Sequence, residues 1–86
     1  MTYRVEYLES VVNEDIPALP KTARRRVRLE IERKLAVHPI HFGKPLQYSL
    51  KGCRRLRVGD YRVVFIIEDE RVVVVKIGHR KDVYDP

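Results

Sequence analysis

The sequence predicts a single α+β domain, residues 1–86, in which helices cover one face of an antiparallel sheet. Apolar residues recur with helical spacing in the first half of the chain and mostly with strand spacing in the second half. The strand candidates are separated by short breaks that are polar or contain glycine, as expected for hairpin turns. A chain of 86 residues is long enough for one modest hydrophobic core and a surface site.

The first half of the chain predicts one strand and two helical segments. Residues 2–7 alternate between apolar and polar side chains, which is typical of a strand with one solvated face. Pro17 and Pro20 exclude a long helix in the next segment, so we expect a short helical turn at residues 11–16 and a bend at the prolines. Residues 22–37 predict the main helix. Its apolar stripe recurs every four residues, at Ala23, Val27, Ile31 and Leu35.

The second half predicts a loop followed by a three-strand antiparallel meander. Pro39 ends the main helix, and residues 38–52, with two prolines and two glycines, predict a loop. Strands are expected at residues 53–58, 61–67 and 72–77. Together with the first strand and the helical hairpin, they complete the predicted α+β domain.

The composition favours a soluble protein with a polyanionic partner. The chain has 18 lysines and arginines against 12 aspartates and glutamates, a net charge of +6, which favours nucleic acid as a partner. The longest apolar runs, residues 63–67 and 72–75, are far shorter than the ~18 residues of a membrane span, so we expect no membrane association. The single cysteine, Cys53, excludes an internal disulfide, and the N-terminus shows no secretory signal. We therefore expect a cytoplasmic protein.

Several cations fall on the predicted strands, where a purely structural sheet would not need them. Arg55 and Arg57 share one face of their strand, and Lys51 extends that face. Arg62 begins the next strand, and Arg80 follows the last one. Because neighbouring strands lie about 4.8 Å apart, these cations can converge on one patch. Guanidinium groups bind phosphate with two parallel hydrogen bonds, so the patch favours a phosphate ligand, with pairing to the chain's own carboxylates as the alternative.

The position of Arg62 is ambiguous in the sequence. It alternates with Val64 and Ile66, which are apolar and belong to the same face of the strand. Arg62 therefore lies either at a strand end near solvent or on a segment turned outward by a bulge.

Metal and cofactor chemistries are not favoured by the motifs present. The three histidines and Cys53 lack the paired spacing of zinc ligands, so we expect no metal. No glycine-rich phosphate loop and no GxSxG or HExxH motif occurs, and we expect no cofactor. Cations without paired carboxylates suit the cleavage of RNA by its own 2′-hydroxyl. Arginines stabilise the dianionic phosphorane of that reaction, and a tyrosine stacks on a base.

The C-terminal segment carries a specific family resemblance. Residues 50–84, LKGCRRLRVGDYRVVFIIEDERVVVVKIGHRKDVY, resemble the C-terminal half of toxins of the RelE/ParE superfamily of toxin–antitoxin modules. The resemblance implies a compact microbial RNase-like fold. For the RelE branch it implies metal-independent cleavage of mRNA in the ribosomal A site, which inhibits translation. It also implies neutralisation by a small acidic antitoxin, with DNA contacted only indirectly, through the antitoxin complex.

The resemblance also implies roles for individual residues. By position, Arg62 matches the arginine that stabilises the phosphate, Arg80 the general acid, and Tyr84 the tyrosine that stacks on the substrate. Arg55 and Arg57 fall where RelE-type enzymes have two lysines, one of them proposed as the base. An arginine, with a pKa above ~12, is a poor base at neutral pH. The expected catalytic set is Arg57, Arg62, Arg80 and Tyr84.

The general base therefore stays open at this point. Lys51, His79 and Tyr84 are the candidates, and the alternative to all three is an enzyme that relies on orientation and charge. His79 has a suitable ordinary pKa of about 6.5, but strand alternation points it away from Arg80. The expected phosphate-binding cations are Lys51, Arg55 and Lys81.

We expect a RelE-type toxin, an endoribonuclease whose partners are a cognate antitoxin, the ribosome and mRNA. Two alternatives stay open: a ParE-type toxin that inhibits DNA gyrase, and a catalytically inactive module that acts only in an antitoxin complex repressing its operon. Arg80 and Tyr84 favour the first, whereas the missing lysine base keeps the inactive module open. We expect the antitoxin to cover apolar surface near Leu29 or the basic sheet face.

Overall fold

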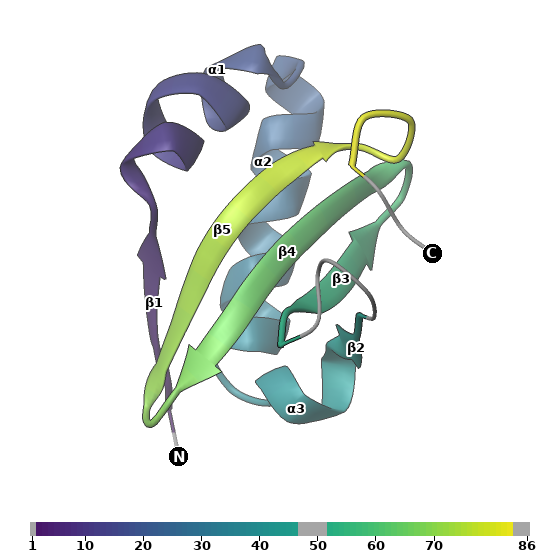
Figure 1. Ribbon diagram of the computed structural model, residues 1–86. Coiled ribbons are helices and arrows are strands. Elements are labelled where there is room, and N and C mark those ends of the chain that lie inside the picture. The colour runs from purple at the N-terminus through teal and green to yellow at the C-terminus, as the bar shows by residue number, and fades with distance from the viewer. Residues whose placement is uncertain (1, 47–51, 84–86) are drawn as a thin grey trace.

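A five-stranded sheet with the order β1-β5-β4-β3-β2 forms the centre of the computed structural model (Figure 1). The model describes residues 2–46 and 52–83, so the predicted site residues Lys51 and Tyr84 lie outside the described residues. The strands are β1 (Arg4–Tyr7), β2 (Lys44–Pro45), β3 (Arg54–Val58), β4 (Tyr61–Glu68) and β5 (Arg71–His79). β1 runs parallel to β5, and the other neighbouring strands are antiparallel.

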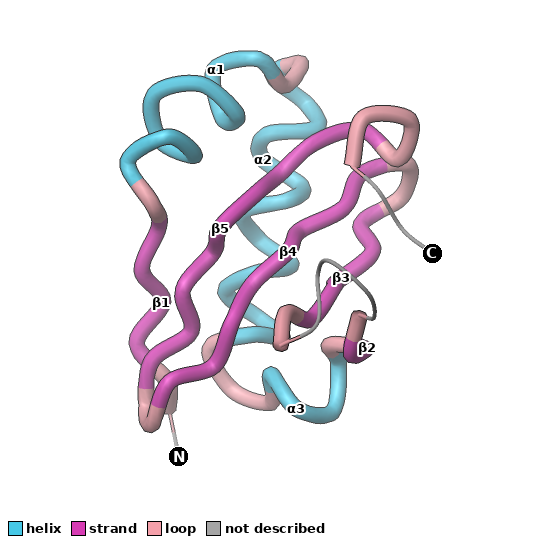
Figure 2. The backbone as a smooth tube through the Cα atoms, in the orientation of Figure 1, coloured by secondary structure: helices cyan, strands magenta, loops and turns pink. Residues whose placement is uncertain are grey.

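The helices lie mainly on one face of the sheet (Figure 2). They are a π-helical turn η1 (Val11–Asp15), α1 (Ile16–Ala18), α2 (Lys21–Glu30), a second π-helical turn η2 (Ile31–Leu35) and α3 (Pro39–Phe42). The short helical turn expected at residues 11–16 is confirmed, and α1 accommodates Pro17 in its first turn, where proline loses no helical hydrogen bond. The main helix expected at residues 22–37 is confirmed as α2 and η2 together.

The strand predictions are confirmed to within one or two residues at each end. The predicted α+β class with a helical hairpin and an antiparallel meander is confirmed as well. The prediction of a loop for residues 38–52 is wrong in part, because this segment contains α3 and β2. Pro39 ends the main helix and also occupies the first turn of α3, where its fixed φ favours the helix and its missing N–H costs nothing.

The main core lies between the helices and the sheet. Val27, Ile31 and Leu35 of the predicted stripe are buried there against Phe65 and Val74 of β4 and β5. A smaller cluster on the other face of the sheet contains Leu46, Val64 and Val83. Both faces of the central strands are therefore covered in part, and the candidate site lies beside the smaller cluster.

A β-bulge in β5 sets which side chains face the helices. Val64 pairs with Lys76, but its neighbour Phe65 pairs with Val74, so Val75 is an extra residue in β5. Before the bulge Val74 faces the helices, and after it Ile77 does. The bulge therefore changes the face of every residue at the end of β5, including those that lead into the predicted site.

Asp15 stabilises the end of β5 where β1 no longer pairs with it. The register between the two strands ends at Tyr7 and Val74. Beyond that point the Asp15 carboxylate, with 9% of its side chain exposed, accepts a hydrogen bond from the Ile77 N–H at 3.0 Å and binds Lys76 Nζ at 3.0 Å. Asp15 therefore holds η1 against the sheet edge.

Replacing Asp15 with alanine is expected to lower the free energy of unfolding by about 1–3 kcal/mol, because the Ile77 N–H loses its acceptor in a part-buried position. Lys76→Ala should cost less than about 1 kcal/mol, since that ion pair is half exposed at the lysine. Urea unfolding of both variants checks this. Equal losses in the two variants would contradict the assignment of the effect to the backbone hydrogen bond.

Candidate active site

Three of the predicted cations meet on the sheet face that points away from α2. Arg57 and Arg62 are directly opposite each other on β3 and β4, and Arg55 is opposite Val64. The intervening Leu56 and Val58 belong to the main core, which places the arginines on the other face. Side chains that are directly opposite across two strands have Cβ atoms about 5 Å apart. The register therefore joins three guanidinium groups into one arginine cluster of Arg55, Arg57 and Arg62.

Arg62 is buried, with only 7% of its surface exposed. Neither sequence-based alternative for Arg62 is correct: the side chain is not near solvent, and the bulge lies at Val75, in the neighbouring strand. Arg62 is opposite Gly78, and Val83 lies so close to Gly78 that a Cβ there would be 2.8 Å from Val83 Cγ2. The chain at Val83 therefore returns over the part of the sheet that carries Arg62. A buried guanidinium keeps its charge and is held in one orientation.

Arg80 is located at the same end of the sheet, just beyond β5. Its N–H donates to the Asp60 carbonyl at 2.7 Å, and its Nε lies 3.9 Å from Asp60 Oδ1. Asp60 belongs to the turn between β3 and β4 and lies two residues before Arg62. The backbone contact therefore fixes where Arg80 leaves the sheet, while its side chain stays exposed. Lys81 follows in the same turn and is also exposed.

His79 lies on the face opposite the arginine cluster. Its ring packs edge-on against Tyr61, with 5.5 Å between the ring centroids, and Tyr61 packs against the main core. The His79 Nδ1 accepts a hydrogen bond from the Lys81 N–H at 3.2 Å. The sheet therefore separates His79 from Arg62. The other two candidates for the general base, Lys51 and Tyr84, lie outside the described residues, so His79 is the one candidate that the structure locates.

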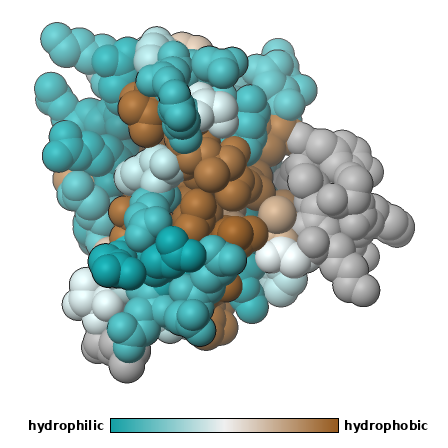
Figure 3. Space-filling view, turned by 60° about the vertical axis from the view of Figure 1, so that its left-hand side comes forward, coloured by the Kyte–Doolittle hydropathy of each residue, from teal (hydrophilic) through white to brown (hydrophobic). Residues whose placement is uncertain are grey.

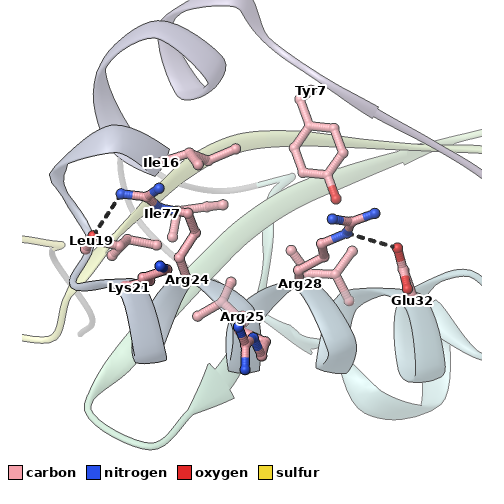
Figure 4. A pocket seen from close by; sticks show the side chains of 11 residues that line it. Tyr7, Ile16, Leu19, Lys21, Arg24, Arg25, Arg28, Glu32 and Ile77 are labelled. Carbon is pink, nitrogen blue, oxygen red and sulfur yellow. Dashed lines mark hydrogen bonds and ion pairs between the residues drawn. The ribbon is translucent and has the colours of Figure 1, made fainter.

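A second feature, which the sequence interpretation missed, is an apolar groove of about 600 Å³ that is lined mainly by α2 and η2, with residues of α1, β1 and β5. Its apolar floor and charged rim are visible in Figure 4, and Figure 3 shows apolar surface framed by hydrophilic side chains on the side of the molecule where β1 lies. The apolar lining consists of Ile16, Leu19, Val27, Ile31 and Ile77. The polar lining consists of Tyr7, Lys21, Arg24, Arg25, Arg28 and Glu32.

The rim of this groove is basic, and two of its arginine side chains are held by contacts within the protein. Arg24 donates to the Leu19 carbonyl at 3.2 Å, and Arg28 pairs with Glu32 at 3.3 Å. Burial raises the pKa of Tyr7, with Glu32 raising it further and Arg28 lowering it, so the Tyr7 phenol stays a neutral hydrogen-bond donor at physiological pH. The signal that could have predicted the groove is the run of cations at helical spacing beside the apolar stripe. Leu29, which together with the basic sheet face was one of the two places where we expected the antitoxin, does not line it.

Comparisons with known proteins agree with this architecture. A family described as the ParE toxin of the type II toxin–antitoxin system parDE matches residues 7–84. The Mycobacterium tuberculosis protein Toxin RelG is 40% identical over 52 residues, which cover 58% of this chain. The aligned part spans 60% of the length of that relative.

Two solved structures share the fold. The toxin–antitoxin complex RelBE2 from Mycobacterium tuberculosis matches with a TM-score of 0.81 and 29% identity, covering 93% of this chain and 100% of the other. The archaeal RelE–RelB complex from Pyrococcus horikoshii matches with a TM-score of 0.70 and 31% identity, covering 96% of this chain and 100% of the other.

Proposed function

Because the chain belongs to the family of ParE toxins of type II toxin–antitoxin systems and shares its fold with RelE toxins, we propose that it is a ribosome-dependent endoribonuclease. Its substrate would be mRNA in the ribosomal A site, and its cleavage would inhibit translation in the cytoplasm. The observation that carries the proposal is the buried Arg62 directly opposite Arg57, on a face that also presents Arg55.

This cluster suits the cleavage of RNA by its own 2′-hydroxyl. The 2′-oxygen attacks the adjacent phosphorus, the bond to the 5′-oxygen breaks, and the products are a 2′,3′-cyclic phosphate and a 5′-hydroxyl. The pentacoordinate intermediate carries two negative charges, which guanidinium groups held in place stabilise strongly. We assign this role to Arg62, with Arg57 beside it and with Arg55 and Lys81 binding flanking phosphates.

The proton transfers are assigned to residues at the edges of the cluster. Arg80 would protonate the departing 5′-oxygen, whose conjugate acid is an alcohol about as weak as water. A guanidinium is a stronger acid than such an alcohol, so an arginine can supply this proton. For the base we retain Lys51 and Tyr84 and rank His79 last, because it lies across the sheet from Arg62. Tyr84 would also stack on a base of the substrate.

The groove gives the proposed antitoxin a binding surface. Its floor is apolar and is surrounded by Lys21, Arg24, Arg25 and Arg28, and within residues 2–46 and 52–83 Glu32 is the one carboxylate in the lining. An amphipathic helix that carries acidic residues beside its apolar stripe matches both features. The solved relatives are complexes of a toxin with its antitoxin, which supports such a partner for this chain.

A purified translation system tests the proposed activity. The protein is added to ribosomes translating a defined mRNA, and primer extension maps new 5′ ends, while a supercoiling assay with DNA gyrase runs in parallel. We expect cuts in the codon occupying the A site and unchanged supercoiling. Inhibition of gyrase without mRNA cuts would instead assign the chain to ParE-type toxins. Inactivity in both assays would favour a module that acts only in an antitoxin complex.

A further inference from the structure

A hollow of about 170 Å³ lies between α3, η2 and the edge of β3. Among the described residues, its lining consists of Lys34, Phe42, Lys44, Arg55, Leu56 and Arg57, which are four cations, an aromatic ring and a leucine, with no carboxylate among them. β2 pairs with β3 only at Arg54 and Arg55, so the edge of β3 at Leu56 and Arg57 is not covered by β2. We call this site the α3 hollow.

Phe42 is held in the hollow with 37% of its surface exposed. Lys34 Nζ lies 5.3 Å from the centroid of its ring, and the His41 ring packs edge-on at 4.8 Å. The next residue, Gly43, packs so tightly that a Cβ there would be 2.2 Å from Phe65 Cζ. This close packing of Gly43 on the core fixes the end of α3 and keeps the Phe42 ring at the surface.

The cations of the hollow continue the arginine cluster. Arg57 lines the hollow and is also directly opposite Arg62. Lys44 is exposed and is opposite Arg55 in the register of β2 and β3. Lys34 is partly neutralised by Glu30, whose carboxylate lies 3.4 Å away. The strand register therefore links Arg62 and Arg57 on β4 and β3 to Arg55 and Lys44 on β3 and β2, and Lys44 lines the same hollow as Phe42.

We infer that the α3 hollow binds single-stranded RNA, with Phe42 stacking on a base and Lys44 binding a phosphate. Proteins that bind single-stranded nucleic acids combine aromatic rings, which stack on the bases, with cations that bind the phosphate backbone. A protein helix would need an apolar floor such as the groove has, whereas the part of the hollow's lining that the structure describes has two apolar residues, Leu56 and Phe42. The inference rests on the proposed function and extends it by a second nucleotide subsite away from the scissile phosphate.

Binding of an uncleavable probe tests the inference. The probe is a fluorescein-labelled 12-nucleotide oligouridylate with 2′-O-methyl groups, measured by anisotropy at several salt concentrations. Phe42→Leu is expected to weaken binding roughly 5-fold or more through lost stacking, while Phe42→Tyr retains it. Lys44→Glu is expected to weaken binding and reduce its salt dependence. An abasic probe of equal length should respond to Lys44→Glu and not to Phe42→Leu.

Two matched variants serve as controls. Ile40→Ala changes an exposed apolar residue of the same helix that does not line the hollow. Arg4→Glu makes the same charge change as Lys44→Glu at β1, at the opposite edge of the sheet. Both should bind the probe like the unchanged protein. Wild-type binding by Phe42→Leu, or equal loss in Arg4→Glu and Lys44→Glu, would overturn the inference.

The outcome is independent of the cleavage experiment, because the probe cannot react. If the translation assay shows no mRNA cuts while Phe42→Leu and Lys44→Glu still bind the probe more weakly, the RNA subsite is supported and the proposed reaction is refuted. If cuts are observed and the two variants bind the probe normally, the reaction stands and the subsite fails. If Lys44→Glu loses affinity for the antitoxin and not for RNA, the hollow is a protein interface and the inference is wrong.

Discussion

Replacing Arg62 with alanine is expected to reduce cleavage of ribosome-bound mRNA by a factor on the order of 10²–10³, the usual cost of removing one preorganised charge donor. Arg62 is buried and lies opposite Arg57, so its guanidinium is already oriented before the substrate arrives. Because the position is buried, water is a poor substitute for the guanidinium that Arg62→Ala removes. Rates of cutting from primer extension, in the defined translation system, measure the loss.

Two further variants separate charge from geometry. Arg62→Lys keeps the positive charge but loses the planar fork that binds two phosphate oxygens, so we expect an intermediate rate. Arg4→Glu, at the far edge of the sheet, should cleave at the unchanged rate. Because Arg62 is buried, urea unfolding and antitoxin binding must show that Arg62→Ala is still folded. A folded Arg62→Ala variant with full cleavage activity would refute the stabilising role.

The sequence predicts the local elements of this fold well because their spacing is local information. The stripe at Val27, Ile31 and Leu35 specifies the helical face, and the alternation along β3 specifies which side Arg55 and Arg57 occupy. The parallel pairing of β1 with β5 joins residues more than 60 positions apart, and no local pattern encodes it. The same holds for the contact of Asp15 with the end of β5.

The shared face of three arginines of the candidate site was predictable from the sequence, and the burial of Arg62 was not. Arg55, Arg57 and Arg62 could be grouped from alternation and hairpin register alone. Arg62 is buried in a part of the sheet where the chain returns from afar, since Val83, 21 positions later, lies against Gly78, the partner of Arg62 in β5. His79 shows the effect of a single inserted residue. The bulge at Val75 changes the face of the end of β5 and moves this histidine to the helix side.

Reversing the charge of two groove residues is expected to release the toxin from its antitoxin. The double variant Lys21→Glu with Arg25→Glu changes neighbouring cations on one side of α2 and leaves the apolar floor intact. Charges at the rim of an interface act mainly on the association rate, so we expect affinity to fall by roughly 100-fold at low salt and less at high salt. Association kinetics with the proposed antitoxin, taken as a small acidic protein encoded by a neighbouring reading frame, measure this at several ionic strengths.

The groove and the arginine cluster lie on opposite faces of the sheet, which makes the two functions separable. The Lys21→Glu, Arg25→Glu variant should cleave mRNA at the unchanged rate and remain toxic in cells that co-express the antitoxin, whereas Arg62→Ala should be harmless and still bind it. Arg4→Glu with Arg33→Glu makes the same charge change outside the groove lining and should be neutralised normally. Normal neutralisation of the groove variant would place the antitoxin elsewhere, and Leu29→Asp would then test the exposed side of α2.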